Sequence, residues 1–122
     1  MVRAVFDTCI LIDHLNGVGG AREELGRYAE RFISVVTWME VMVGTTPVTD
    51  AATHAFLDGF VVVPLDGHVS ERAVAIRRER RMRLPDAIIA ATAASIAAVL
   101  VTRNTKDFDA TDPGVRVPYT TV

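Results

Sequence analysis

The sequence predicts a three-layer α/β/α fold, in which helices cover both faces of a mostly parallel sheet of four to five strands. Short apolar runs alternate with segments of helical periodicity along the 122 residues, which is the pattern of repeated βαβ units. Half of the chain is hydrophobic and 23% is charged, enough apolar material for one core and too much for a disordered chain. We therefore expect residues 1–122 to form a single domain.

Each expected strand is a short apolar run that stops at a polar residue, a glycine or a proline. The expected strands are residues 1–6, 32–36, 60–63, 99–102 and 115–117. The expected helices are residues 8–15, 21–31, 37–44, 49–58, 68–81 and 87–98. Thr37 and Glu40 have the spacing of a capping box, and Asp86 lies at or near the N-cap of the last helix. That last helix is rich in alanine, so we expect it to be buried against the sheet.

The basic residues are dominated by arginine, and half of the twelve arginines lie between Arg72 and Arg83. A net charge of −2 argues against global electrostatic capture of a polyanion. This one basic segment nevertheless allows a polyanionic partner. The candidates for phosphate contacts are Arg77, Arg78, Arg80, Arg81 and Arg83. A solvated helix face, interspersed with glutamates, explains the same arginines equally well.

Cysteine content and hydropathy exclude several classes of protein. The single cysteine, Cys9, cannot form an internal disulfide, and no Cys/His cluster is spaced to hold a structural zinc ion. No apolar run reaches the roughly 18 residues of a membrane span. The acidic residues near the N-terminus do not fit a signal peptide. We therefore expect a protein of the reducing cytosol that does not enter a membrane.

Four acidic residues are expected at one edge of the sheet. Asp7 directly follows the first strand, and Glu40 lies one helical turn beyond the second. Asp107 lies five residues after Thr102, which ends the fourth strand, and Asp86 begins the buried helix before that strand. Ligands of open α/β sheets bind beyond the carboxyl ends of the strands, so one crevice is able to collect these acids. Converging carboxylates need a compensating cation, and oxygen donors favour Mg²⁺ or Mn²⁺ over zinc.

Each acid taken singly also has a structural explanation. Glu40 completes the capping box, and Asp86 caps a helix. Asp107 fits a turn that begins at Asn104. Asp7 is the hardest to explain structurally, since it ends an apolar strand and has no basic partner nearby in sequence after Arg3. Spacing alone leaves both interpretations open, because the gaps between the acids are long.

Four segments spread over nearly the whole chain carry a family resemblance. They are DTCILID from Asp7, TWMEV from Thr37, LPDAIIAATA from Leu84 and LVTRNTKDF from Leu100. In this order they resemble the PIN domain and, more narrowly, the VapC-type ribonuclease toxins of bacterial type II toxin–antitoxin systems. Any one segment is a loose signal, whereas all four together in a chain of this length are specific.

The resemblance implies a PIN-like domain that acts as a metal-dependent endoribonuclease. Asp7, Glu40 and Asp86 match three acids of the family pattern, and Asp107 matches the fourth. All four are expected to be catalytic and to bind Mg²⁺ or Mn²⁺. Asn104 stands where many relatives carry a further acid, which leaves the number of metal ions open. The implied reaction is attack of a metal-activated water on an RNA phosphodiester, leaving a 5′-phosphate and a 3′-hydroxyl.

Polar residues next to these acids are expected to orient them or to orient water. They are Thr8, Thr102 and Asn104. Asp13 follows Asp7 by six residues, and we interpret it as a solvated or helix-pairing residue. Cys9 is interpreted as a small buried hydrophobic residue rather than a nucleophile.

Three partners follow from the resemblance rather than from composition. The implied substrate is RNA, and such toxins are usually homodimers. They are also held inactive by a cognate, VapB-like antitoxin whose C-terminal segment covers the acidic site. An apolar groove on the early helices suits that segment. The residues expected to line it are Leu11, Leu15, Trp38 and Met42.

Two other functions remain as alternatives. A receiver-type phosphorylation switch has this length, a parallel sheet and an acid after the first strand. Against it, the acid that follows the third strand, Asp66, comes late and behind Pro64, and the only lysine, Lys106, lies in a turn. A phosphatase with an aspartyl nucleophile needs a second acid two residues after the first, where this chain has Cys9.

Overall fold

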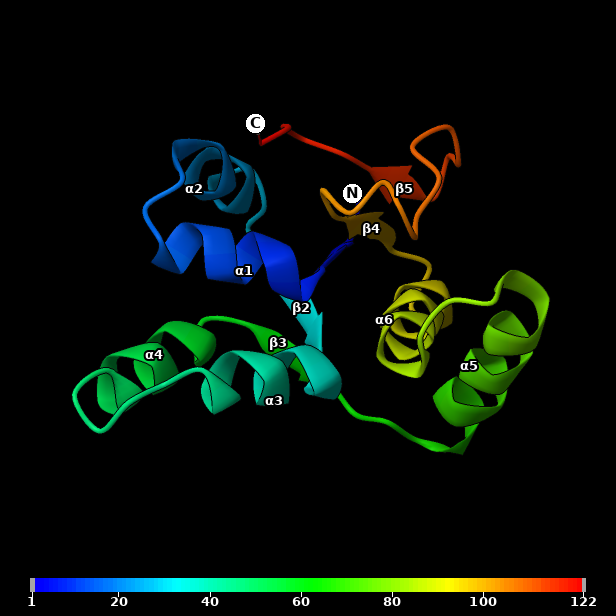
Figure 1. Cartoon of the computed structure of the whole chain (residues 1–122), viewed down its shortest axis with the longest axis horizontal. Coiled ribbons are helices and arrows are strands. Elements are labelled where there is room, and N and C mark those ends of the chain that lie inside the picture. The colour runs from blue at the N-terminus through cyan, green and yellow to red at the C-terminus, as the bar shows by residue number, and fades with distance from the viewer. Residues whose placement is uncertain (1, 122) are drawn as a thin grey trace.

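The computed structural model describes residues 2–121, which fold into three layers as the sequence predicts (Figure 1). The strands are β1 (Ala4–Phe6), β2 (Arg31–Ser34), β3 (Val61–Val63), β4 (Val99–Val101) and β5 (Val115–Arg116). The helices are α1 (Thr8–Leu15), α2 (Gly19–Gly26), α3 (Val35–Val43), α4 (Asp50–Leu57), α5 (Gly67–Arg80) and α6 (Leu84–Ser95). Within the described residues, no helix is long and apolar enough to cross a membrane.

The strands form one sheet in the order β3-β2-β1-β4-β5, and all four pairings are parallel. The chain first adds β2 and β3 on one side of β1 and then returns to add β4 and β5 on the other side. The strand order therefore reverses between β1 and β4, and ligands of such sheets bind beyond the carboxyl ends of the strands at this point. Asp7 follows β1 at that place, and its backbone N–H donates to the carbonyl of Val101 at the end of β4 (2.9 Å).

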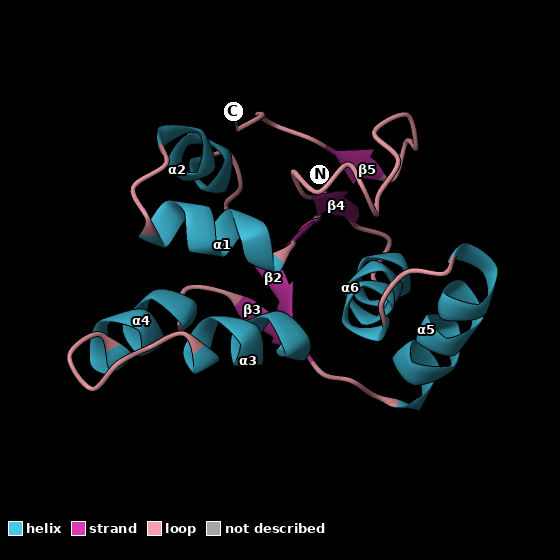
Figure 2. Cartoon of the chain, viewed as in Figure 1, coloured by secondary structure: helices cyan, strands magenta, loops and turns pink. Residues whose placement is uncertain are grey.

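The alternation of side chains along β1 assigns the helices to opposite faces of the sheet (Figure 2). Ala4 and Phe6 belong to a buried cluster formed with α1, α2 and α4. Val5 points to the other face and packs with residues of α6. As predicted, α6 is buried against the sheet, since it contacts β1, β2 and β4, while α5 covers its outer side. The small residues of α6 allow this close approach, and Ala87 and Ala91 are fully buried.

Several element boundaries differ from the sequence-based expectation. The strand predicted at residues 32–36 ends at Ser34, whose hydroxyl accepts from the N–H of Val36 and caps α3. The prediction of a capping box formed by Thr37 and Glu40 was therefore wrong. Both residues lie inside α3, where Thr37 is fully buried. The helix expected at residues 21–31 begins earlier, at Gly19, and ends at Gly26. Gly20 is needed there because a Cβ atom would lie 2.8 Å from the ring of Tyr119.

The helix expected at residues 87–98 begins three residues earlier, at Leu84. Arg83 is its N-cap, Pro85 occupies the first turn, where proline is tolerated, and Asp86 lies in the same turn. The helix ends before Ala97, which has a positive φ of 53°. The early start directs Asp86 toward the sheet edge where Asp7 lies.

Candidate active site

Asp7 is the most buried of the expected site acids. Only 4% of the residue is exposed, and its two carboxylate oxygens accept from different partners. The N–H of Thr8 donates to Oδ1 (2.8 Å), and the hydroxyl of Thr102 donates to Oδ2 (2.7 Å). The Cys9 thiol also donates to Oδ2 (3.5 Å). Burial raises the pKa of the Asp7 carboxyl above its usual range, although these hydrogen bonds oppose the rise.

Glu40 reaches the same place from α3. Its Oε1 accepts from the hydroxyl of Thr8 at 2.7 Å, and that hydroxyl lies 3.0 Å from the hydroxyl of Thr37. The carboxylate is exposed, so it keeps contact with solvent at the mouth of the site. Thr8 therefore links the two acids: its N–H donates to Asp7 and its side chain donates to Glu40. The predicted orienting position of Thr8 is consistent with these contacts.

Asp86 approaches from the opposite helical layer. It is 5% exposed, and Nε of Arg83 donates to its Oδ2 over a long 3.4 Å. Burial raises the pKa of Asp86, and the negative charges of Asp7 and Asp107 raise it further, while Arg83 lowers it. The neighbouring carboxylates therefore disfavour the ionised form of Asp86. A cation bound between these acids would offset their repulsion.

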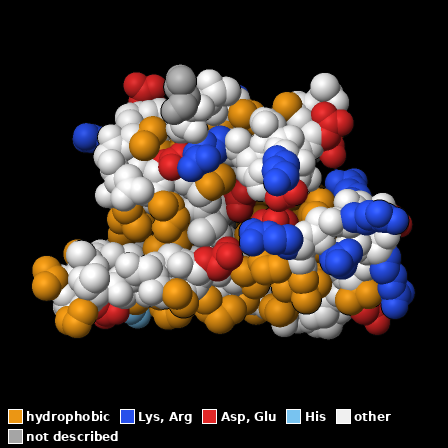
Figure 3. Space-filling model, viewed as in Figure 1, with side chains coloured by type: hydrophobic (Ala, Val, Ile, Leu, Met, Phe, Trp, Pro, Cys, Tyr) orange, Lys and Arg blue, Asp and Glu red, His pale blue; other side chains and the backbone are white. Residues whose placement is uncertain are grey.

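The three acids line one pocket of about 560 Å³ at the sheet edge. Its walls are formed by Asp7, Thr8, Cys9, Ile12, Glu40, Arg83, Asp86, Arg103, Asn104, Thr105 and Lys106. On the surface, acidic side chains gather at the centre of this face beside basic ones (Figure 3). The segments that carry the acids are far apart in sequence, so the fold brings them together.

Asp107 lies next to this pocket without lining it. It is half-buried, and Asn104 donates from Nδ2 to its Oδ2 (2.9 Å). The backbone N–H of Asn104 in turn donates to the hydroxyl of Thr102 (3.0 Å), the group that holds Asp7. The turn expected from Asn104 to Asp107 is therefore present. Asp107 is nevertheless near enough for its charge to raise the pKa of Asp86.

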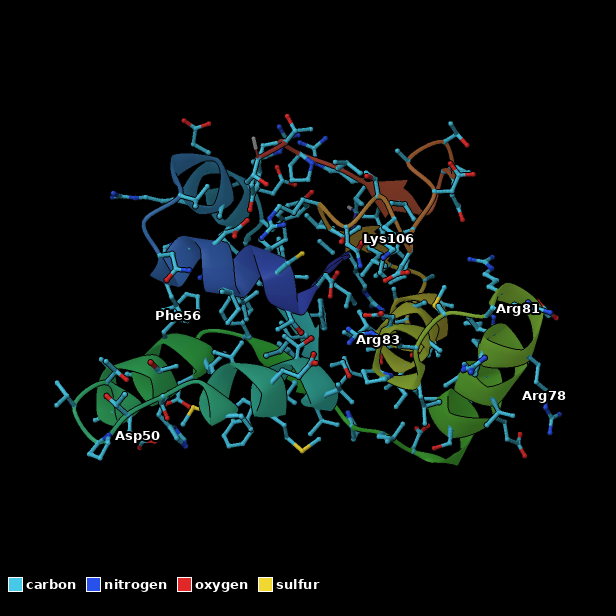
Figure 4. All side chains as sticks on the ribbon, in the orientation of Figure 1. Asp50, Phe56, Arg78, Arg81, Arg83 and Lys106 are labelled. Atoms are coloured by element: carbon cyan, nitrogen blue, oxygen red, sulfur yellow. The ribbon has the colours of Figure 1, made fainter. Side chains whose placement is uncertain are left out.

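The arginine-rich segment divides into two parts. Arg77, Arg78 and Arg80 lie exposed in the last turns of α5, and Arg81 follows with a positive φ of 54°. Figure 4 shows Arg78 and Arg81 pointing away from the pocket and Arg83 pointing toward it. Of the five candidate phosphate-binding arginines in the described chain, Arg83 alone lines the acidic pocket.

The donor set fits a hard divalent cation by its chemistry. Carboxylate and hydroxyl oxygens dominate, and the sulfur of Cys9 stays protonated, since burial raises the pKa of its thiol to about 11. In residues 2–121, no three His, Cys, Asp or Glu side chains lie close enough together to hold an ion as they stand. Thr8 donates to Glu40, and Arg83 donates to Asp86. For one ion to be bound by both carboxylates, Glu40 and Asp86 have to move closer to each other.

Sequence reasoning missed one group of residues beside the pocket. Asp13 is neither solvated nor paired within its helix: it is 5% exposed and accepts from both Arg103 and Tyr119. The spacing of these three residues carries no signal. The only feature of the sequence that bears on the burial of Asp13 is its position in a mostly apolar helix, six residues after Asp7.

The apolar groove on the early helices is present, with a different lining. Leu11 is fully buried and unable to line it. A pocket of about 600 Å³ between α1, α3 and α4 is lined by Leu15, as predicted, and by residues that include Ile12, Val41 and Val48. The predicted residues Trp38 and Met42 do not line it. Leu15 and Val48 are 43% and 90% exposed, so their apolar surface is open to a partner.

The sequence of this chain matches the model of the PIN domain family over residues 4–113. The match spans the first four strands and the pocket acids, so the chain belongs to the PIN domain family. No curated protein sequence matches it at a significant level.

Solved structures agree with this assignment. A toxin–antitoxin complex from Klebsiella pneumoniae contains a chain 43% identical to this one, with a TM-score of 0.91 over 97% of this chain and 99% of that chain. A DNA-bound VapBC complex from Salmonella typhimurium has a chain with 26% identity and a TM-score of 0.73, covering 95% of this chain and 96% of that chain. FitAcB from Neisseria gonorrhoeae, at 22% identity and a TM-score of 0.80 over 94% and 97%, shares the fold. The resemblance to VapC-type PIN domains is thus confirmed.

Proposed function

We propose that this chain is the toxin of a type II toxin–antitoxin pair, and that it cleaves RNA as a metal-dependent endoribonuclease. The observation that carries the proposal is the convergence of Asp7, Glu40 and Asp86 on one pocket at the switch point of the sheet. Membership of the PIN family, and the toxin–antitoxin complexes among its structural relatives, support a toxin nuclease. A receiver domain is not supported, since its strand order is 2-1-3-4-5 whereas this sheet has 3-2-1-4-5.

The pocket acids are proposed to hold Mg²⁺ or Mn²⁺, with Asp107 contributing through its charge or as a ligand. When bound, such an ion activates water and screens the charge of a phosphodiester. Thr102 and Thr8 keep the Asp7 carboxylate in one orientation. One of the pocket acids is proposed to accept the proton of the attacking water.

The arginines are proposed to bind the RNA backbone at two distances from the acids. Arg83 lines the pocket and is placed to contact a phosphate next to the cleaved bond. Arg77, Arg78, Arg80 and Arg81 lie further out and extend this path. Each neutralised phosphate adds affinity that falls with salt, so replacing Arg77 and Arg78 by alanine is expected to reduce the salt dependence of RNA binding.

The antitoxin partner is proposed to be VapB-like and to dock in the apolar groove between α1, α3 and α4. Ile12 lines both this groove and the acidic pocket, so a bound segment is able to continue from one to the other. We also propose that the chain forms a homodimer, in which two acidic pockets serve one RNA.

The proposed activity is tested by RNA cleavage with the wild type and with Asp7→Asn, each in Mg²⁺, in Mn²⁺ and in EDTA. The wild type is expected to cut RNA with either ion and to stop in EDTA, leaving 5′-phosphate ends. Asp7→Asn keeps the shape of the side chain and removes its charge, so cleavage is expected to fall at least 100-fold. Equal cleavage by the two proteins would exclude Asp7 from the mechanism.

A further inference from the structure

Three residues form a hydrogen-bonded group at one wall of the acidic pocket, here called the pocket trio: Asp13, Arg103 and Tyr119. Arg103 donates through Nε and Nη2 to the two oxygens of Asp13, the second bond measuring 2.9 Å. The hydroxyl of Tyr119 donates to Oδ2 of Asp13 at 2.7 Å. The trio connects α1, the loop after β4 and the C-terminal segment, which are distant in sequence.

Arg103 lies in the sequence between two residues that donate hydrogen bonds to the site acids. Thr102 donates to Asp7, and Asn104 donates to Asp107. The N–H of Asn104 also donates to the hydroxyl of Thr102, so the residues on both sides of Arg103 are coupled. Holding the side chain of Arg103 therefore fixes the loop that holds the acids.

The contacts of the trio also determine the position of the positively charged guanidinium of Arg103. Arg103 lines the pocket together with Asp7 and Asp86, and 31% of its side chain is exposed. Its guanidinium is engaged by both oxygens of Asp13, with the planar, two-pronged geometry that suits arginine. The hydrogen bonds from Arg103 lower the pKa of Asp13, so this carboxylate is ionised at neutral pH and matches the arginine charge.

We propose that Asp13 is a positioning residue for the metal site, acting through Arg103. It keeps the loop of residues 102–107 in place, so that Thr102 presents its hydroxyl to Asp7. It also holds the guanidinium of Arg103 away from the pocket acids, where an unpaired arginine would compete with a divalent cation. This inference rests on the proposed function, because it assumes that the acids bind Mg²⁺ or Mn²⁺.

The molecule contains a matched internal control, here called the remote trio: Glu24, Arg116 and Tyr28. Arg116 donates to both oxygens of Glu24 (2.6 and 2.9 Å), and the hydroxyl of Tyr28 donates to Oε2 (3.0 Å). Glu24 is 2% exposed and Asp13 is 5% exposed, so both carboxylates are buried. The remote trio connects α2 to β5, and none of its residues lines the acidic pocket in the described chain.

The test compares Asp13→Asn with Glu24→Gln, each of which removes one buried charge from such a trio. Two quantities are measured for both variants and the wild type: the rise in Tm on adding Mn²⁺, and the Mn²⁺ concentration that gives half-maximal RNA cleavage. Both variants are expected to lower the Tm without metal by similar amounts. Only Asp13→Asn is expected to weaken Mn²⁺ binding, by about tenfold or more, which is the usual effect of losing a group that orients metal ligands.

Tyr119→Phe is the milder variant if Asp13→Asn does not fold. It removes one of the bonds to Asp13 and is expected to shift the Mn²⁺ dependence in the same direction by less, whereas Tyr28→Phe leaves it unchanged. Equal Mn²⁺ responses of the paired variants overturn the inference. If the wild type binds Mn²⁺ without cutting RNA, the Tm measurement still decides about Asp13. If the wild type does not bind Mn²⁺, the inference and the proposed metal site fail together.

Discussion

The pocket trio and the remote trio have the same chemistry and different surroundings. In each, an arginine donates through two nitrogens to a buried carboxylate that also accepts from a tyrosine hydroxyl. Arg116 lies in the strand at the edge of the sheet, where its backbone carbonyl accepts from the N–H of Thr102 (3.0 Å). Its side chain donates to Glu24 and makes no hydrogen bond to a site acid in the described residues. Arg103 lies between two residues that donate to site acids. The two trios therefore differ in what the neighbours of the arginine contact, and this difference is what we propose gives the pocket trio a role at the site.

Removing the arginine from each trio is expected to have the largest effect on stability. Arg103→Met and Arg116→Met each remove the arginine that donates two hydrogen bonds to a buried carboxylate, and Arg103→Met is expected to lower the free energy of unfolding by about 3 kcal/mol. The loss is expected to be smaller for Arg116→Met, because Nε of Arg27 stays 3.7 Å from Glu24. Urea unfolding measures this loss. At a temperature where both variants are folded, only Arg103→Met is expected to lose RNA cleavage. Similar cleavage by both would make the pocket trio merely structural.

Two glycines of α2 provide a smaller and more local test. A Cβ atom at Gly20 would lie 2.8 Å from the ring of Tyr119, whereas one at Gly26 meets nothing within 4 Å. Gly20→Ala is therefore expected to displace Tyr119 from Asp13 and to cost about 1–2 kcal/mol. Gly26→Ala is expected to stabilise the chain by about 0.5 kcal/mol, because alanine favours the helix. Thermal unfolding measures both, and a stabilising Gly20→Ala would show that Tyr119 is not held there.

The pH dependence of stability separates the trio acids from the pocket acid Asp7. The pKa of Asp13 is lowered in the folded chain by the hydrogen bonds from Arg103, so its contribution is present above the unfolded pKa and is lost as the pH falls. The pKa of Asp7 is raised by burial, so the unfolded chain loses this proton first as the pH rises. Ionised Asp7 therefore destabilises the folded chain near neutral pH in the absence of metal.

Asp7→Asn is expected to raise the stability of the metal-free chain at pH 7 by about 1 kcal/mol, or roughly 4 °C in Tm. The gain is expected to shrink toward pH 4, because the folded wild-type chain takes up the proton of Asp7 as the pH falls. Thermal unfolding between these pH values, in EDTA, measures the difference. A destabilised Asp7→Asn at pH 7 would mean that the hydrogen bonds of Thr8 and Thr102 outweigh the burial of the charge.

Much of the fold was predictable because local signals agreed with the final structure. The helix over Thr8–Leu15 and the small-residue helix against the sheet follow from patterning alone. The boundary at Ser34 was mispredicted because Val35 and Val36 suit a strand, while the hydroxyl cap of Ser34 starts a helix there. Local propensity was overridden by a single cap.

The candidate site was predictable only in part, for a physical reason. Asp7, Glu40 and Asp86 were found because each follows or begins a recognisable element and matches a family motif. Asp13 was missed because its partners, Arg103 and Tyr119, are about 90 and 106 residues away, and no sequence spacing encodes such a contact. Long-range ion pairs of this kind emerge only from the fold.

The central claim is that the acids of this pocket form a divalent-cation site. Mn²⁺ titration followed by electron paramagnetic resonance measures free Mn²⁺ directly and does not depend on RNA cleavage. The wild type is expected to bind Mn²⁺ saturably, and Asp7→Asn to bind it at least tenfold more weakly. Equal binding by the two proteins, or none by either, would contradict the account.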